Sequence, residues 1–84
     1  MPSRRKLPLQ GRTAIVTGAA GDIGFATAKR FVAAGARVAL VDLDPKALRT
    51  AEVRLRAKNR VLTLACNIAD PAAVRSAVAQ VARA

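Results

Sequence analysis

Apolar residues along this chain fall into three short runs, each followed by a stretch with helical spacing. The runs cover residues 13–18, 36–42 and 60–66, and each is rich in valine, leucine, isoleucine or alanine. Short apolar runs that end at turn residues are typical of strands buried on both faces of a parallel sheet. The pattern therefore predicts three strands, each followed by one helix.

Glycine and Asp-Pro pairs mark where the helices begin and end. A first helix is predicted over residues 23–34, because Gly35 follows it as a C-terminal cap. Asp-Pro at 44–45 supplies an N-cap acid and a proline at the first helical position, and predicts a second helix that reaches about Lys58. Asp-Pro at 70–71 opens the third helix by the same device.

The second and third helices each carry an apolar stripe that can pack on a sheet. The stripe residues are Ala47, Leu48, Ala51 and Leu55 in the second helix and Val74, Ala77, Val78 and Val81 in the third. This alternation predicts an α/β fold of the Rossmann type, a βαβαβα half with a parallel sheet and strand order 3-2-1. Such a half stops before the fourth strand. We therefore expect the first strand to lie at an open edge, with a marginally stable chain that self-associates there.

A glycine-rich loop joins the first strand to the first helix, and it reads Thr17-Gly18-Ala19-Ala20-Gly21-Asp22-Ile23-Gly24. Gly18 fits a tight turn, Gly21 lets the backbone approach a pyrophosphate, and Gly24 allows close helix–strand packing. The free N–H groups that open the helix then face the phosphates. Glycines in such a turn can also be purely structural, so the loop alone does not identify a ligand.

An acidic residue at the end of the second strand makes the pattern more specific. Asp42 follows Gly24 at close to the separation of about 20 residues expected for the acid that binds the adenosine ribose hydroxyls. A carboxylate there repels a 2′-phosphate, which favours NAD over NADP, although Asp44 is a rival for this role. Neither P-loop nor flavin-type glycine spacing is met. We assign residues 13–84 to a partial dinucleotide-binding domain and residues 1–12 to a basic N-terminal tail.

Composition and charge narrow the class of protein. The net charge is +10, with basic residues concentrated in 1–12 and 46–60. This distribution is compatible with a nucleic-acid footprint. However, no aromatic residues alternate with the basic ones, so a basic tail and a solvated helix face are favoured.

Histidine is absent, and the single Cys66 is expected to be a small core residue. Neither a secretory signal nor a membrane span is found, which predicts a cytoplasmic protein.

Together these residues resemble the short-chain dehydrogenase/reductase family. The likeness runs from about Leu9 to Val78, and Thr17-Gly18 is similar to the Thr-Gly that opens that family's glycine motif. The spacing Thr17-Gly18-x-x-Gly21-x-x-Gly24 is similar to that of the family's extended branch. Residues 36–44 look more like the shorter branch, so the branch is left open.

The resemblance implies a set of residues that bind the cofactor. Asp22 replaces a glycine of the shorter branch, and its carboxylate either caps the helix or disturbs the phosphate site. Asn67 stands where the family usually has an aspartate that binds the adenine amino group, and its amide oxygen can accept that bond. The predicted NAD-binding residues are Gly18, Gly21, Asp22, Ile23, Gly24, Asp42, Leu43, Asn67 and Ile68, and no catalytic or metal-binding residue is predicted.

The catalytic residues that the resemblance implies are a serine and a Tyr-x-x-x-Lys motif, and these 84 residues contain no tyrosine. We therefore expect NAD binding without hydride transfer by this chain alone, within a homo-oligomeric parent oxidoreductase that acts on an alcohol or ketone. Two other functions stay open. NAD affinity without the family's later motifs would indicate a non-catalytic nucleotide-binding module. Steeply salt-dependent DNA binding would indicate a basic nucleic-acid-binding or interaction protein.

Overall fold

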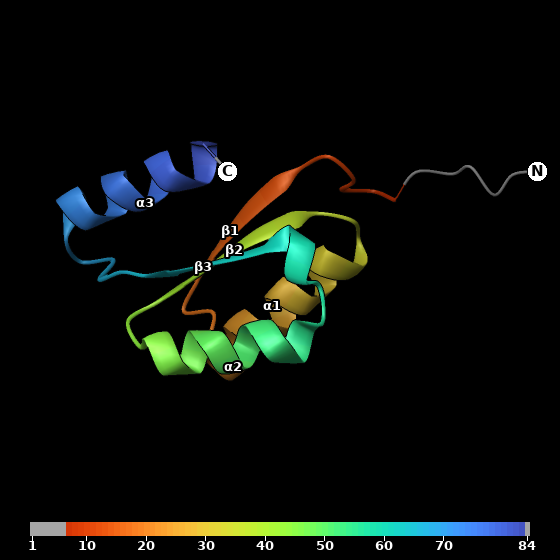
Figure 1. Ribbon diagram of the computed structural model, residues 1–84, viewed down its shortest axis with the longest axis horizontal. Coiled ribbons are helices and arrows are strands. Elements are labelled where there is room, and N and C mark those ends of the chain that lie inside the picture. The colour runs from red at the N-terminus through yellow and green to blue at the C-terminus, as the bar shows by residue number, and fades with distance from the viewer. Residues whose placement is uncertain (1–6, 84) are drawn as a thin grey trace, which may run out of the picture.

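The computed structural model describes residues 7–83 of the chain. Strands and helices alternate along it, as Figure 1 shows. The elements are β1 (Thr13–Thr17), α1 (Asp22–Ala33), β2 (Arg37–Asp42), α2 (Pro45–Leu55), the 3-10 helix η2 (Lys58–Arg60), β3 (Val61–Ala65) and α3 (Pro71–Arg83). The expected βαβαβα order is confirmed.

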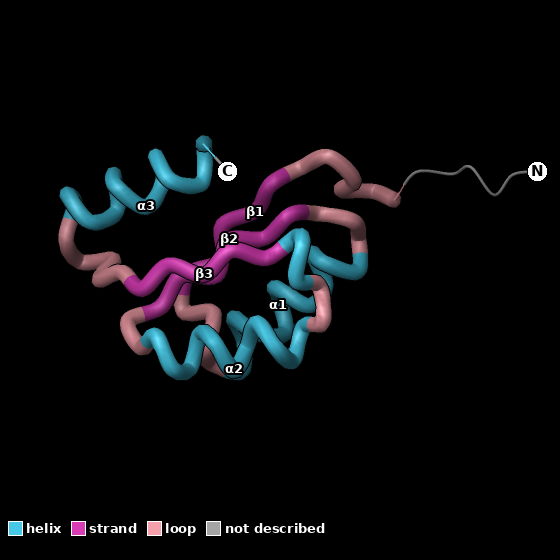
Figure 2. Tube along the Cα trace, in the orientation of Figure 1, coloured by secondary structure: helices cyan, strands magenta, loops and turns pink. Residues whose placement is uncertain are grey.

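The three strands form one parallel sheet in the order β1-β2-β3, which confirms the predicted strand order. Thr17 of β1 pairs with Val41, and Asp42 of β2 pairs with Ala65, so all three strands end at one edge of the sheet. Helices α1 and α2 lie on one face of the sheet and α3 lies on the other, as the tube view makes clear (Figure 2). This edge, where every strand gives way to a loop, is called the carboxyl edge below.

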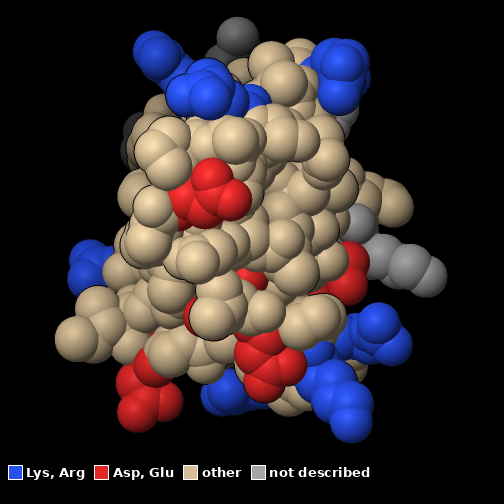
Figure 3. Space-filling view, turned by 90° about the vertical axis from the view of Figure 1, so that its left-hand side faces the viewer, with Lys and Arg blue, Asp and Glu red and all other residues tan. Residues whose placement is uncertain are grey.

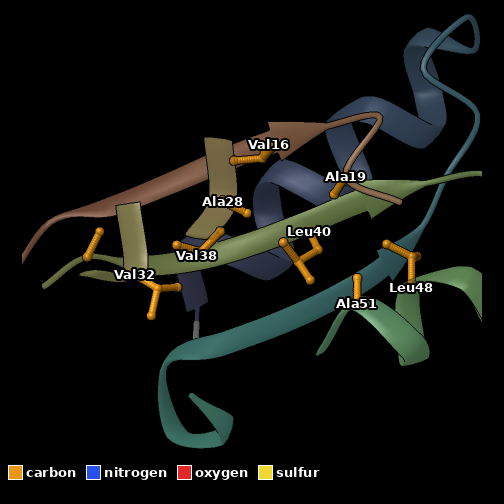
Figure 4. Packing of buried hydrophobic residues seen from close by; sticks show 9 residues of the cluster. Val16, Ala19, Ala28, Val32, Val38, Leu40, Leu48 and Ala51 are labelled. Carbon is orange, nitrogen blue, oxygen red and sulfur yellow. The ribbon is translucent and has the colours of Figure 1, made fainter. Parts of the chain in front are cut away.

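The core lies between the sheet and the pair α1 and α2. Alternate strand residues point toward these helices, and Leu40 of β2 and Leu48 of α2 meet there at 0% and 1% exposure. Figure 4 shows the cluster, to which β1 contributes Val16 and α1 contributes Ala28. The apolar stripe predicted for the second helix is confirmed at its centre, since Leu48 and Ala51 are buried.

The predicted helix caps are present. Gly35 follows the last turn of α1 at a φ of +97°, a left-handed conformation that glycine adopts without strain. The N–H groups of Gly35 and Ala36 donate to the carbonyls of Val32 and Phe31, both at 3.0 Å, which is the Schellman arrangement. Asp44 accepts from the N–H of Lys46 at 3.0 Å and so caps α2.

The end predicted for the second helix is wrong by three residues. Helix α2 stops at Leu55, because Arg56 adopts a left-handed conformation with a φ of +54° and turns the chain toward η2. The turn lets the Arg60 side chain reach back to the end of α1, where it donates to the carbonyl of Val32 at 3.0 Å. The sequence offers no signal for this turn, since arginine is an ordinary helix former.

Helix α3 covers the opposite face of the sheet less completely. It begins where predicted, with Asp70 accepting from the N–H of Ala72 at 3.0 Å, but none of its residues is buried. Val78 is 48% exposed, and a small apolar cavity of about 40 Å³ remains between α3 and the sheet. Cys66 lines this cavity and is half-buried, so it contributes to the packing only in part.

The chain before β1 packs against the end of α1. The N–H of Leu9 donates to the carbonyl of Ala34 at 2.8 Å, and the Leu9 side chain packs on the core. The tail assigned to residues 1–12 stays a prediction, because Arg4, Arg5 and Lys6 lie outside the described residues. None of the helices within residues 7–83 has the length and apolar character needed to cross a membrane.

Candidate dinucleotide-binding site

The predicted site residues come together at the carboxyl edge of the sheet. The glycine loop follows β1, Leu43 follows β2, and Asn67 and Ile68 follow β3. Strand pairing in register brings these three connections side by side. In open parallel sheets this edge is where ligands bind.

The glycine loop makes a tight turn at its first glycine. Gly18 has a φ of +63°, which a residue with a side chain rarely adopts. The N–H of Gly21 donates back to the Gly18 carbonyl at 3.1 Å and closes the turn. The N–H of Ala19 continues the sheet ladder by donating to the Val41 carbonyl at 3.1 Å.

The last glycine of the loop permits a close contact between α1 and the loop itself. A Cβ atom at Gly24 would collide with the Gly18 carbonyl oxygen and lie 2.7 Å from the Gly18 carbonyl carbon. A Cβ atom at Gly21 would meet only the Gly18 carbonyl oxygen, at an ordinary distance of 3.4 Å. The close approach predicted for Gly24 is therefore present, although its partner is the backbone of the loop rather than the body of the strand.

The first turn of α1 presents backbone N–H groups without a side-chain cap. The N-cap residue is Gly21, which has no side chain to accept a bond from them. Asp22 occupies the first helical position and is exposed. Its side chain makes no capping hydrogen bond, so the helix-capping role considered for it is not observed. The N–H groups of Asp22, Ile23 and Gly24 consequently have no partner within the helix and are available to an anion.

The Asp42 carboxylate lies between the end of β2 and the glycine loop. Its Oδ2 accepts from the N–H of Ala20 at 3.0 Å, and its Oδ1 accepts from the N–H of Leu43 at 2.7 Å. The Ala20 N–H, and to a lesser degree those of Leu43 and Asp44, hold the pKa of Asp42 below its ordinary value, against partial burial, which raises it. Asp42 is therefore a carboxylate at neutral pH.

Ala20 joins the candidate site through its bond to Asp42, although the sequence offers no signal for it. Its contribution is a backbone N–H, and every residue except proline has one. Asp44, the rival of Asp42, caps α2 through Lys46 and has a structural role in this chain.

Two exposed apolar side chains flank the far part of the carboxyl edge. Leu43 directly follows β2 and is 64% exposed, and Ile68 lies three residues after the end of β3 and is 59% exposed. Asn67, just before Ile68, uses its side-chain oxygen to accept from the N–H of Ala69 at 3.0 Å, and its NH₂ group has no acceptor among residues 7–83. The described residues contain no group of three or more potential metal ligands.

Negative charge gathers at this edge. Four of the five acidic residues of the chain, Asp22, Asp42, Asp44 and Asp70, lie where strands end or helices begin. Figure 3 views the molecule from this side, with acidic side chains across the face and Lys and Arg side chains around its margins. The arrangement complements the helix dipoles, since acids sit at helix N-termini.

Comparison with known proteins identifies the family. The sequence profile described as short chain dehydrogenase matches residues 12–84. The 1-deoxy-11-beta-hydroxypentalenate dehydrogenase of Streptomyces avermitilis is 44% identical over 68 residues, which make up 80% of this chain and 25% of that protein. The D-threitol dehydrogenase of Mycolicibacterium smegmatis is 40% identical over 77 residues, 88% of this chain and 29% of that protein.

Solved structures give the same result. An NAD+-bound xylitol dehydrogenase superposes with a TM-score of 0.85 and 36% identity, covering 90% of this chain and 30% of its own. A 3-ketoacyl-(acyl-carrier-protein) reductase from Brucella melitensis, solved with NADH, superposes with a TM-score of 0.79 and 33% identity, covering 87% and 29%. The chain spans only 25 to 30% of the length of each of these four proteins. With its parallel βαβαβα fold and its glycine loop, the chain belongs to the short-chain dehydrogenase family.

Proposed function

We propose that this chain forms the NAD(H)-binding part of an oxidoreductase that acts on an alcohol or a ketone. The observation that carries the proposal is the Asp42 carboxylate at the end of β2, held beside the glycine loop by the Ala20 N–H. A carboxylate in this position accepts hydrogen bonds from the two ribose hydroxyls of NAD, and it repels the 2′-phosphate of NADP. The two similar structures named above, solved with NAD+ and NADH, support this choice.

Apart from Asp22, whose exposed carboxylate lies in the first turn of α1, the residues present fit a dinucleotide along this edge. The uncapped N–H groups at the start of α1 suit the pyrophosphate, and the space in front of Gly18 stays open, since a Cβ atom there would meet nothing within 4 Å. Asp42 suits the ribose, and we assign the adenine to the region of Leu43, Asn67 and Ile68. The nicotinamide ring, when bound, supplies the hydride chemistry.

This chain's own contribution is binding and orientation. Its 84 residues contain no tyrosine, and Ser3 and Ser76 are the only serines. Proton transfer to or from an alcohol or ketone is therefore assigned to other parts of the parent enzyme. A homo-oligomeric state and a cytoplasmic location remain part of the same proposal.

Titration of the 84-residue chain with NADH and NADPH, followed by calorimetry, tests the proposal. NADH should bind at least about tenfold more tightly, because the Asp42 carboxylate repels the 2′-phosphate of NADPH, and a repulsion of about 1.4 kcal/mol corresponds to a factor of ten in affinity. Asp42→Ala should weaken NADH binding and reduce this preference, whereas Asp44→Asn should leave it in place. Equal affinity of the unmodified chain for NADH and NADPH would contradict the role given to Asp42.

A further inference from the structure

The Asp42 carboxylate contacts the glycine loop as well as the carboxyl edge. Its Oδ2 accepts from the N–H of Ala20, 22 residues earlier, at 3.0 Å. Ala20 lies in the middle of the loop, between Gly18 and Gly21. One side chain at the end of β2 is thus tied to the backbone of the connection between β1 and α1.

The glycine loop has little else to hold its middle in place. Gly18 is in a left-handed conformation, and a Cβ atom placed on it would have no protein atom within 4 Å. Ala19 is anchored by burial and by the ladder bond to Val41, and the N–H of Gly21 is used within the turn. Among the described residues, Asp42 is the one side chain that accepts from an N–H of residues 18–21.

We propose that Asp42 is a positioning residue for the phosphate-binding loop, and that it holds the Ala20 N–H before any cofactor is bound. The inference rests on the proposed function of the site and adds a second role to the same residue. Asp42 then couples the two parts of the dinucleotide site. Its carboxylate accepts hydrogen bonds from the ribose hydroxyls, and its bond to Ala20 fixes the conformation of the loop that binds the pyrophosphate.

One carboxylate can perform both roles at once. An ionised carboxylate has about four acceptor positions on its two oxygens, and the N–H groups of Ala20 and Leu43 take two of them, with a weaker contribution from the Asp44 N–H. Asp42 is only partly buried, so the protein does not enclose this residue completely. A bond from a backbone N–H to an ionised acceptor is stronger than a neutral one, which suits a role in holding a glycine-rich segment.

Amide hydrogen exchange in the nucleotide-free 84-residue chain tests the positioning role directly. Exchange of the Ala20 amide should be about tenfold faster in Asp42→Ala, because a charge-assisted hydrogen bond is lost. Asp42→Asn should give an intermediate rate, since its amide oxygen can still accept one bond. The Ala19 amide, bonded to Val41, serves as the internal reference for a folded sheet.

Asp44→Asn is the matched control for this experiment. It removes one negative charge from the same edge and keeps an acceptor that caps α2. The Ala20 exchange rate should not change in this variant. An unchanged Ala20 rate in both Asp42 variants, with Ala19 still protected, would overturn the inference.

Binding of ADP and 2′,3′-dideoxy-ADP separates the two roles of Asp42. The dideoxy ligand has no ribose hydroxyls, so a residue that acts only on the ribose cannot affect its binding. We expect Asp42→Asn to bind dideoxy-ADP about threefold to tenfold more tightly than Asp42→Ala does, since both lack the charge and only the asparagine can hold Ala20. Equal binding by the two variants would contradict the positioning role. Failure of the unmodified chain to bind ADP would contradict the proposed function, and the amide exchange would still decide the inference.

Discussion

The face of the sheet that α1 and α2 cover differs from the face that α3 covers in how completely its side chains are buried. On the first face, Leu40 and Leu48 are 0% and 1% exposed and belong to one continuous cluster. On the second, Ile15 of β1 is 45% exposed, α3 has no buried residue, and an apolar cavity remains beneath that helix. Two helices suffice to cover one side of three strands, and one helix does not.

The difference depends on position in the sheet more than on the strand sequences. Ala39 and Val41 point toward the α3 side and are still 1% and 3% exposed, because β2 lies between two neighbours. Ile15 points to the same side from β1, which pairs only with β2 within the described residues. Burial of an apolar side chain on the α3 side of this sheet therefore depends on a neighbouring strand on each side. Among residues 7–83 the edge strand β1 has a neighbour on one side only, so Ile15 stays exposed.

The largest effect is expected at the contact between the well-packed helix α1 and the glycine loop. Gly24→Val should abolish nucleotide binding and destabilise the chain by several kcal/mol, because even its Cβ atom would collide with the Gly18 carbonyl. Thermal unfolding and NADH titration would measure both effects. Gly21→Ala is the control for the unfolding measurement, since its Cβ atom would lie 3.4 Å from the nearest protein atom and its φ is −80°. A Gly24→Val chain that still bound NADH normally would show that the loop can move away from α1.

The two faces of the sheet should respond differently to the same truncation. Leu40→Ala on the face of α1 and α2 should lower the free energy of unfolding by about 2–5 kcal/mol, as for a fully buried leucine. Leu64→Ala, at a half-buried position of β3 beside α3, should lower the free energy of unfolding by only about 1 kcal/mol, because the native side chain buries less apolar surface. Denaturant unfolding of the two variants makes the comparison. Equal losses would mean that α3 covers its face as well as the other helices cover theirs.

The smallest effect is expected on self-association. Because β1 is an edge strand with an exposed Ile15, the chain should associate through this strand, and Ile15→Lys should weaken association on the order of tenfold. Val53→Lys is the control, since Val53 is 71% exposed on α2 and away from this edge. Sedimentation velocity over a range of concentrations gives the measurement. An unmodified chain that stayed monomeric at high concentration would refute this interpretation of β1.

Local sequence signals were sufficient to predict most of the elements, and they also indicated the location of the candidate site. Three apolar runs, two Asp-Pro pairs and Gly35 predicted the strands and helices to within a few residues, because caps and periodicity act over one or two turns. The glycine loop and Asp42 indicated a dinucleotide site because their spacing along a βαβ unit reflects its geometry. The left-handed turn at Arg56 was not predicted, since arginine has no preference for that conformation.

The sequence by itself determined the order of the elements, the direction of the strands and the residues available at the carboxyl edge. Only the tertiary structure decided which groups meet there. The bond from Ala20 to Asp42 joins residues 22 positions apart and depends on how β1 and β2 pair, and its donor is a backbone N–H with no signature in the sequence. The incomplete burial of α3 was likewise decided by tertiary structure, because a periodic apolar stripe specifies which side of a helix packs and not how much surface receives it.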